Sequence, residues 1–290
     1  MGTSKTVLLL ASGALAVLLA SGVAFLAALT SAPAASAASR DHGASFAVRC
    51  DFTHRNADDP IVHPGHQGAA HSHDFFGNTS TKFDSTYVSM LAEPTSCTRS
   101  EDTAGYWFPT VKWNGVDLQA HRAVFYYRAG GKDHTQVKPF VADLRVINAS
   151  RITWSCGTKD TAAGTKTPPT RCGGGVLGLR IVFPDCSNGR TDSADHRSHM
   201  ARSVLKSDGK RRCPGTHPVP VPTLTVNANF RIPTTPGEVT LSSGGASSMH
   251  ADFWNTWDQQ ALVALVERCI NGVPPSEPRP EECRAPTAPA

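Results

Sequence analysis

The sequence predicts a mostly β fold: a single β-sandwich or jelly-roll-like domain with long loops, one C-terminal helix and disulfides. Short runs of alternating apolar residues, separated by Gly, Pro, Asn and Asp, are typical of β-strands. The 21 prolines and 24 glycines interrupt long helices. The eight cysteines are an even number, which indicates disulfides in an oxidising compartment.

The individual elements follow in chain order. The pair Asn114-Gly115 has the signature of a tight hairpin turn. A helix is expected at residues 258–271, because the apolar residues there follow helical spacing and Asn271-Gly272 can end the helix. The expected strands are residues 46–50, 107–113, 123–127, 140–147, 177–183 and 223–232.

The N-terminus has the features of an export signal. A start that carries Lys5 precedes an apolar stretch at residues 7–29 and the small-residue site Ala35-Ser36-Ala37, so residues 1–37 are expected to be a cleaved signal peptide. The alternative is an uncleaved anchor, since the stretch is long enough to span a bilayer. The expected organisation then continues with a flexible lead-in (38–45), one β-rich domain (46–272) and a Pro-rich tail (273–290). Either way, the domain works outside the cytoplasm.

The cysteines all lie after the signal. Eight cysteines allow 105 pairings, of which sequential pairing is the simplest. No Cys-x-x-Cys pair occurs, which argues against cysteine-based zinc sites and thioredoxin-type redox chemistry. The Gly-, Thr- and Pro-rich stretch 158–175 is the one candidate linker, but its flanking cysteines favour a stapled loop within one domain. The expected pairs are Cys50–Cys97, Cys156–Cys172, Cys186–Cys213 and Cys269–Cys283, the last of which would tie the tail.

The charge pattern excludes one class of partner. The formal net charge is +4, and basic and acidic residues are interspersed apart from the short run 210–212. Such a run is typical of a solvated loop, so no nucleic acid is expected as a partner. After signal cleavage no membrane contact is expected either, and the protein is expected to be a monomer.

Histidines supply the strongest functional pattern. Of the twelve, the densest group lies at residues 63–73. If His71 and His73 sit on a strand, alternation puts both side chains on one face, where imidazoles can hold one divalent ion, zinc or copper. A third ligand is required, and His250 and His199 are the candidates. The alternative is that these histidines are structural and hydrogen-bonded at the edge of the core.

Carboxylates and aromatic residues add to this pattern. Asp74 and Asp252 each follow a histidine motif and are expected to orient an imidazole or, with His73 and His250, to act in catalysis. A second hypothesis is a glycosidase, in which two carboxylates face each other across a groove. Asp59, Asp185 and Asp258 also suit turns and caps. The expected substrate-binding residues are Trp254, Trp257 and Tyr106, although the run around Tyr106 is also typical of core and turn.

Several short motifs follow one another along the chain in a fixed order. They are residues 59–62, 64–65, 71–73, 76–78, 95–97, 102, 106–109, 126–128, 199–200, 213–214, 217–219, 250–253 and 257–258. In this order they resemble an exported family catalogued as domain of unknown function 1996, over about Phe46 to Cys269. The resemblance implies one extracellular domain of the kind secreted by filamentous fungi and actinomycetes, with no settled reaction. The chain departs from the family form at Ala201-Arg202 and at Thr256.

These observations lead to three hypotheses. The first is an extracellular hydrolase or metal-assisted enzyme that acts on a polysaccharide, with His71, His73 and His250 at its centre. The second is a non-catalytic module that binds carbohydrate or cell wall through the same aromatic residues. The third is a secreted metal-binding protein.

Overall fold

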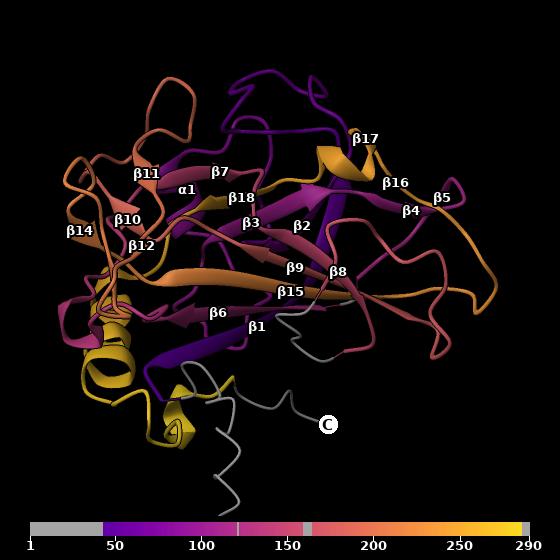
Figure 1. Cartoon of the computed structure of the whole chain (residues 1–290). Coiled ribbons are helices and arrows are strands. Elements are labelled where there is room, and N and C mark those ends of the chain that lie inside the picture. The colour runs from indigo at the N-terminus through magenta and orange to yellow at the C-terminus, as the bar shows by residue number, and fades with distance from the viewer. Residues whose placement is uncertain (1–42, 121, 159–163, 286–290) are drawn as a thin grey trace, which may run out of the picture. The chain divides into compact units, whose positions relative to one another are not determined.

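The computed structural model describes residues 43–120, 122–158 and 164–285 (Figure 1). The expected signal peptide and most of the expected lead-in lie outside these residues. Within them, no helix is both long and apolar enough to cross a membrane.

Nine antiparallel strands form the main sheet, which bends at β1 (Ser45–Asn56). The first half of β1 pairs with β6, and its second half, beyond an irregularity between Phe52 and His54, pairs with β2. The sheet therefore has two halves joined through one strand. In order, the strands are β7 (Arg145–Asn148), β18 (Ala251–Trp254), β3 (Gly105–Pro109), β2 (His73–Gly77), β1, β6 (Arg122–Arg128), β15 (Thr223–Arg231), β9 (Val176–Val182) and β8 (Ile152–Cys156).

The two halves pack their inner faces against each other. Tyr106 of β3 stacks on Phe125 of β6 with ring centroids 3.9 Å apart, and Phe108 meets Phe230 of β15 edge to face. These rings are buried, and aromatic rings are among the largest contributors to the free energy gained by burying apolar surface. The prediction of a mostly β fold is confirmed.

The outer face of the β18-β3-β2 half carries a second, smaller apolar cluster. Because side chains alternate along a strand, Phe75 and Trp107 point away from the main core, where their rings stack with centroids 5.6 Å apart. Trp254 joins them, and Ile61 covers them from the segment that precedes β2. This outer face is the platform on which the candidate site lies.

Smaller sheets flank the main one. The predicted hairpin is confirmed: Trp113 pairs with Val116, and the turn residues Asn114 and Gly115 have φ angles of 50° and 81°, as a type I′ turn requires. The three small sheets are β17-β16-β4-β5, β11-β10-β14 and β12-β13. Their strands are β4 (Val111–Trp113), β5 (Val116–Asp117), β10 (Cys186–Ser187), β11 (Met200–Ala201), β12 (Val204–Leu205), β13 (Arg211–Arg212), β14 (Val219–Pro220), β16 (Val239–Leu241) and β17 (Gly244–Gly245).

The predicted C-terminal helix is also confirmed. It consists of α2 (Gln259–Leu265) and a π-helical turn η3 (Val266–Asn271), and the side chain of Asp258 caps it by accepting from the Ala261 N–H. Asp258 therefore has the capping role. The short helix α1 was not expected. The remaining helical segments are α1 (Tyr87–Leu91), η1 (His134–Gln136), η2 (Ala246–Ser248) and η4 (Glu281–Cys283).

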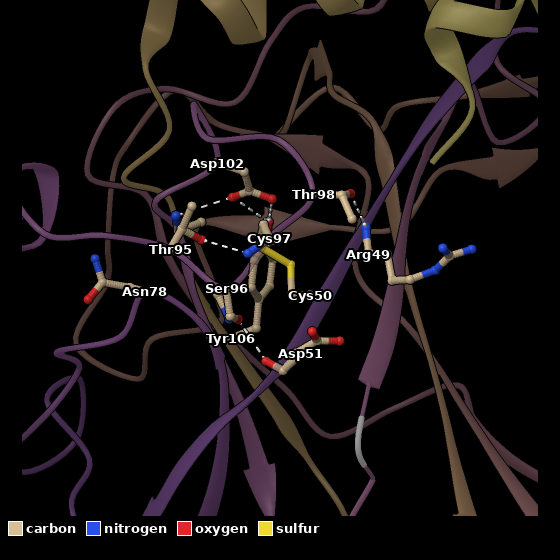
Figure 2. Close-up of a disulfide and its surroundings, with 12 residues drawn as sticks. Arg49, Cys50, Asp51, Asn78, Thr95, Ser96, Cys97, Thr98, Asp102 and Tyr106 are labelled. Atoms are coloured by element: carbon tan, nitrogen blue, oxygen red, sulfur yellow. Dashed lines mark hydrogen bonds between the residues drawn. A yellow bond between two sulfur atoms is a disulfide. The ribbon is translucent and has the colours of Figure 1, made fainter. Parts of the chain in front are cut away.

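All four disulfides follow the sequential pairing that was expected. Figure 2 shows Cys50–Cys97, which joins β1 to the loop before β3 beside the buried carboxyl of Asp102. Although Asp102 and the two sulfur atoms lie close together, the sulfurs are bonded to each other and are not thiolate ligands. Asp102 instead accepts a hydrogen bond from the Tyr106 hydroxyl at 2.9 Å. This group is structural.

Two expected strands differ from those observed. The expected strand 107–113 is divided at Thr110 into β3 and β4, which belong to different sheets. Of the expected strand 140–147, only the end is extended, as part of β7. Asp143, in the middle of that segment, has a φ of 61°, a left-handed conformation that is incompatible with a continuous strand.

Candidate metal centre

Two strands bring the site together because both pair with β3. In the register of the sheet, His73 lies opposite Pro109 on β3, and Asp252 of β18 lies opposite Trp107. Pro109 and Trp107 are two residues apart on β3, so their partners His73 and Asp252 project from the same face of the sheet. His250 directly precedes β18 and lies level with Pro109 when this register is extended by two residues.

The segment 57–72 covers this end of the outer face and supplies the third histidine. Asp59 fixes its first turn, since one carboxylate oxygen accepts from the backbone N–H groups of Ile61 and Val62 at 2.9 Å each. Gly65 and Gly68 have φ angles of 78° and 68°, which other residues rarely adopt. The segment thereby returns to the sheet just before β2. His71 lies in the segment that leads into β2, so it is not on the same strand as His73, although the sequence pattern had predicted that it would be.

Three imidazole rings meet at this point. The ring centroids of His71 and His73 are 4.2 Å apart, those of His71 and His250 are 5.0 Å apart, and those of His73 and His250 are 5.7 Å apart. One nitrogen from each ring lies within 4.8 Å of the others. Imidazoles brought this close can share one ion, because a tetrahedral metal binds histidine nitrogens at about 2.0–2.1 Å.

Backbone carbonyls select the tautomer of two of the rings. Nδ1 of His73 lies 3.0 Å from the carbonyl oxygen of Asp58, and Nδ1 of His250 lies 3.0 Å from that of Ser248. A carbonyl can only accept, so each Nδ1 carries the proton and each Nε2 keeps its lone pair. Nε2 of His73 and Nε2 of His71 are buried without a hydrogen-bond partner among the described residues. This is the arrangement that metal-binding histidines show.

Two carboxylates complete the cluster. One carboxylate oxygen of Asp59, one carboxylate oxygen of Asp252 and one ring nitrogen of His73 all lie within 4.8 Å of one another. Asp252 is 1% exposed, and neither of its oxygens has a hydrogen-bond partner in the described part of the chain. Its Oδ2 is 3.9 Å from Nε2 of His250. A buried carboxylate without partners is costly, and a bound cation would offset that cost.

Burial sets the protonation states of the cluster. It lowers the pKa of His71 to about 4, the pKa of His73 well below its usual 6.5, and the pKa of His250 in the same direction. Burial also raises the pKa of Asp252 well above its usual 3.8, with a further rise from the charge of Asp59. The histidines are therefore neutral at neutral pH, which is the form that binds metal ions.

The cluster opens into a small cavity of about 110 Å³. Its walls are formed by polar residues of the cluster, by apolar side chains and by Arg197. The lining residues are Asp59, Val62, His63, Ala70, His71, Ile147, Arg197, His250 and Asp252.

Two predicted site residues lie outside the cluster. Asp74 points to the other face of β2, where its oxygens bind Nε and Nη2 of Arg55 at 2.6 and 3.0 Å and accept from the Thr110 hydroxyl. It therefore does not orient His73, and its expected catalytic role is corrected to a structural ion pair. His199 is buried, and its Nδ1 contacts the hydroxyl of Ser193 at 2.9 Å. It does not belong to the donor group that contains the other three histidines.

The aromatic residues expected to bind substrate are core residues. Trp254, Trp257 and Tyr106 are only 1%, 0% and 2% exposed. Trp254 donates to Asp143, and Trp257 donates to the Tyr127 hydroxyl. None of these rings presents a face to solvent, so the expectation that they flank a substrate is wrong. Amphipathic rings that are fully buried find internal hydrogen-bond partners in this way.

Sequence reasoning missed one residue and underrated another. Asp59 was assigned to a turn, and it does form that turn, but only one of its oxygens is used there. Arg197 gave no signal of its own, because a single arginine in a loop is most often a solvated charge. Its position between His196 and His199 was the only available hint.

Comparison with known proteins identifies the family. A family model described as domain of unknown function (DUF1996) matches residues 59–257, a span that contains all the residues of the cluster. No curated protein and no solved structure matches the chain. Since the match covers more than half of the sequence, the chain belongs to the family of the domain of unknown function DUF1996.

Proposed function

We propose that this domain is an exported metalloprotein that binds one divalent ion, zinc or copper, through Nε2 of His71, His73 and His250, with Asp252 as a further ligand. The observation that carries the proposal is the convergence of three neutral imidazoles, two of which, His73 and His250, lie beside a buried carboxylate, that of Asp252, which has no hydrogen-bond partner among the described residues. Imidazole ligands suit zinc and copper, whereas calcium and magnesium take oxygen ligands.

The same geometry supports metal-assisted hydrolysis. A catalytic zinc site has three protein ligands and keeps one position open for water. With Asp252 as the fourth protein ligand, water would take a fifth position. His71, His250 and Asp252 line the cavity that a substrate group would enter. Zinc in such a site lowers the pKa of bound water to about 7. Asp59 uses only one carboxylate oxygen in its turn, and its other oxygen would be the group that takes up a proton when a metal ion is bound.

The export of the protein and its substrate class belong to the same proposal. Four disulfides are typical of proteins outside the cytoplasm, and the apolar N-terminal stretch has the composition of a signal. A polysaccharide substrate is compatible with the cavity only through a terminal or protruding group, because about 110 Å³ is too small for a sugar ring with its neighbours. The buried tryptophans argue against a carbohydrate-binding module that relies on aromatic stacking.

Metal analysis tests this proposal. Protein prepared without a polyhistidine tag, stripped with a chelator and then titrated with zinc or copper is expected to bind one ion per chain. Binding should release protons, because burial raises the pKa of Asp252 and a bound cation would lower it again. A stoichiometry of zero for both ions would remove the proposal, and the cluster would then be a set of structural histidines.

A further inference from the structure

Arg197 supplies a positive charge at the cavity that the proposed metal centre does not use. It is exposed at the cavity wall, in the segment between β10 and β11. Its guanidinium has no hydrogen-bond or ion-pair partner among the residues that the structure describes. Arg197 lines the same cavity as His71, His250 and Asp252 of the cluster.

The backbone around Arg197 is held firmly. The carboxylate of Asp195 accepts from the N–H groups of Arg197 and Ser198 at 3.2 and 2.9 Å and from the Ser193 hydroxyl at 2.8 Å. The Ser193 hydroxyl in turn contacts the buried ring of His199. Such local side-chain-to-backbone bonds fix a loop without regular secondary structure.

A second attachment ties this loop to the sheet. His196 adopts a φ of 54°, and its carbonyl accepts from the N–H of Ile147, which itself lines the cavity. The His196 ring lies 2.9 Å from the Asp192 carboxylate. A non-glycine residue rarely adopts this conformation and keeps it where the surrounding structure imposes it. The loop therefore presents Arg197 at the cavity from a fixed position.

The charges at the cavity indicate what kind of ligand fits it. If one divalent ion binds with Asp59 and Asp252 ionised, the two carboxylates and the ion cancel, and the charge of Arg197 stays unbalanced. A guanidinium forms paired hydrogen bonds with planar or tetrahedral oxyanions. Val62, Ala70 and Ile147 add apolar surface to the cavity, which His63 also lines. This lining favours a ligand whose charged group enters the cavity and whose remainder stays outside.

We infer that the cavity binds a small oxyanion, a carboxylate or a phosphate group, held between the metal ion and the guanidinium of Arg197. This inference rests on the proposed metal centre and adds the ligand class to it. A substrate of the site would then present an acidic group at its end. On a polysaccharide, that is an acidic terminal sugar or an acidic substituent.

Cobalt(II) provides a direct test, because it replaces zinc and its visible absorption reports the ligands of the ion. Inorganic phosphate and acetate are titrated separately into the cobalt-loaded protein. In the wild type each oxyanion that fits is expected to change the spectrum in a saturable way, and the tighter of the two identifies the group. Arg197→Gln is expected to weaken this binding by about tenfold or more, because a hydrogen bond to a charged group is lost.

Matched variants separate the outcomes. Arg190→Gln changes another exposed arginine in the same segment, away from the cavity, and should leave anion binding unchanged. Arg197→Lys should recover part of the affinity lost in Arg197→Gln. Equal anion affinities for the wild type and Arg197→Gln would overturn the inference while the cobalt spectrum still supports the metal centre. Absence of any cobalt spectrum in the wild type would overturn the metal centre itself, and the anion site with it.

Discussion

The rings of His73 and His250 face each other across strand β3, with centroids 5.7 Å apart and an interplanar angle of 81°. Each ring is anchored through Nδ1 to a backbone carbonyl, that of Asp58 for His73 and that of Ser248 for His250, so Nε2 of each ring keeps its lone pair. This preorganisation reduces the cost of ordering the ligands when an ion binds.

Replacement of either ring should abolish stoichiometric metal binding. His73→Ala and His250→Ala each remove one of three imidazoles and leave too few ligands for a closed site. We expect zinc affinity to fall at least about 100-fold, given that even residues that only hydrogen-bond to a metal ligand are worth about 10–100-fold in affinity. Isothermal titration of the stripped proteins measures this. His66→Ala is the control, since His66 is exposed in the same segment and outside the donor group; a similar loss in His66→Ala would contradict the assignment.

Asp252→Asn should separate stability from metal binding. The buried carboxyl has no partner among the described residues, so a neutral amide of the same shape is expected to raise the free energy of unfolding of the metal-free protein by about 1 kcal/mol. Zinc affinity should fall by about tenfold or more, because a charged ligand is lost. Urea denaturation with and without zinc measures both effects. A variant that is less stable without metal and binds zinc normally would show that Asp252 is structural.

The ion pair between Arg55 and Asp74 should matter for stability alone. Arg55→Met removes the guanidinium and leaves the buried carboxylate of Asp74 with its hydrogen bond from the Thr110 hydroxyl. We expect the free energy of unfolding to fall by about 3 kcal/mol, as when one member of a buried pair is removed. Metal stoichiometry should stay at the wild-type value. Loss of metal from a variant that is still folded at the assay temperature would place Asp74 in the centre after all.

His54 should make the domain less stable in acid. Its ring stacks on Phe75 with centroids 4.6 Å apart, and burial lowers the pKa of His54 below its usual 6.5. The unfolded chain therefore takes up a proton at higher pH than the folded domain does. The stability that neutral His54 provides is complete above about pH 6.5 and is lost as the pH falls toward the lowered pKa.

His54→Gln removes this titration and tests it. The difference in the free energy of unfolding between about pH 8 and about pH 5 should be smaller in the variant than in the wild type. Metal-free protein is used for both, so that changes in metal binding do not contribute. An identical pH dependence in the two proteins would mean that the His54 pKa is the same in the folded and unfolded chains.

The local chemistry of the sequence determined much of the architecture. Alternating apolar residues predicted, at least in part, six of the nine strands of the main sheet. Asn114-Gly115 predicted its hairpin, and Asp258 with Asn271 marked the two ends of the C-terminal helix. Each of these features depends on residues close together in the chain, so a pattern of a few residues contains the necessary information. The His71/His73 pair and His250 were recognised as donors for the same reason, from residue type and spacing.

Only the tertiary structure decided which donors meet. The β18-β3-β2 order brought Asp252 and His250 to His73, and it placed Asp74 on the opposite face with Arg55. It also buried Trp254 and Trp257 in apolar clusters and carried Arg197 to the cavity on a loop. Strand pairing joins segments that are distant in the chain, and a one-residue change of register turns every side chain to the other face. No local pattern in the sequence encodes the register of strand pairing. The sequence therefore identified candidate ligands, and only the fold showed which of them lie together.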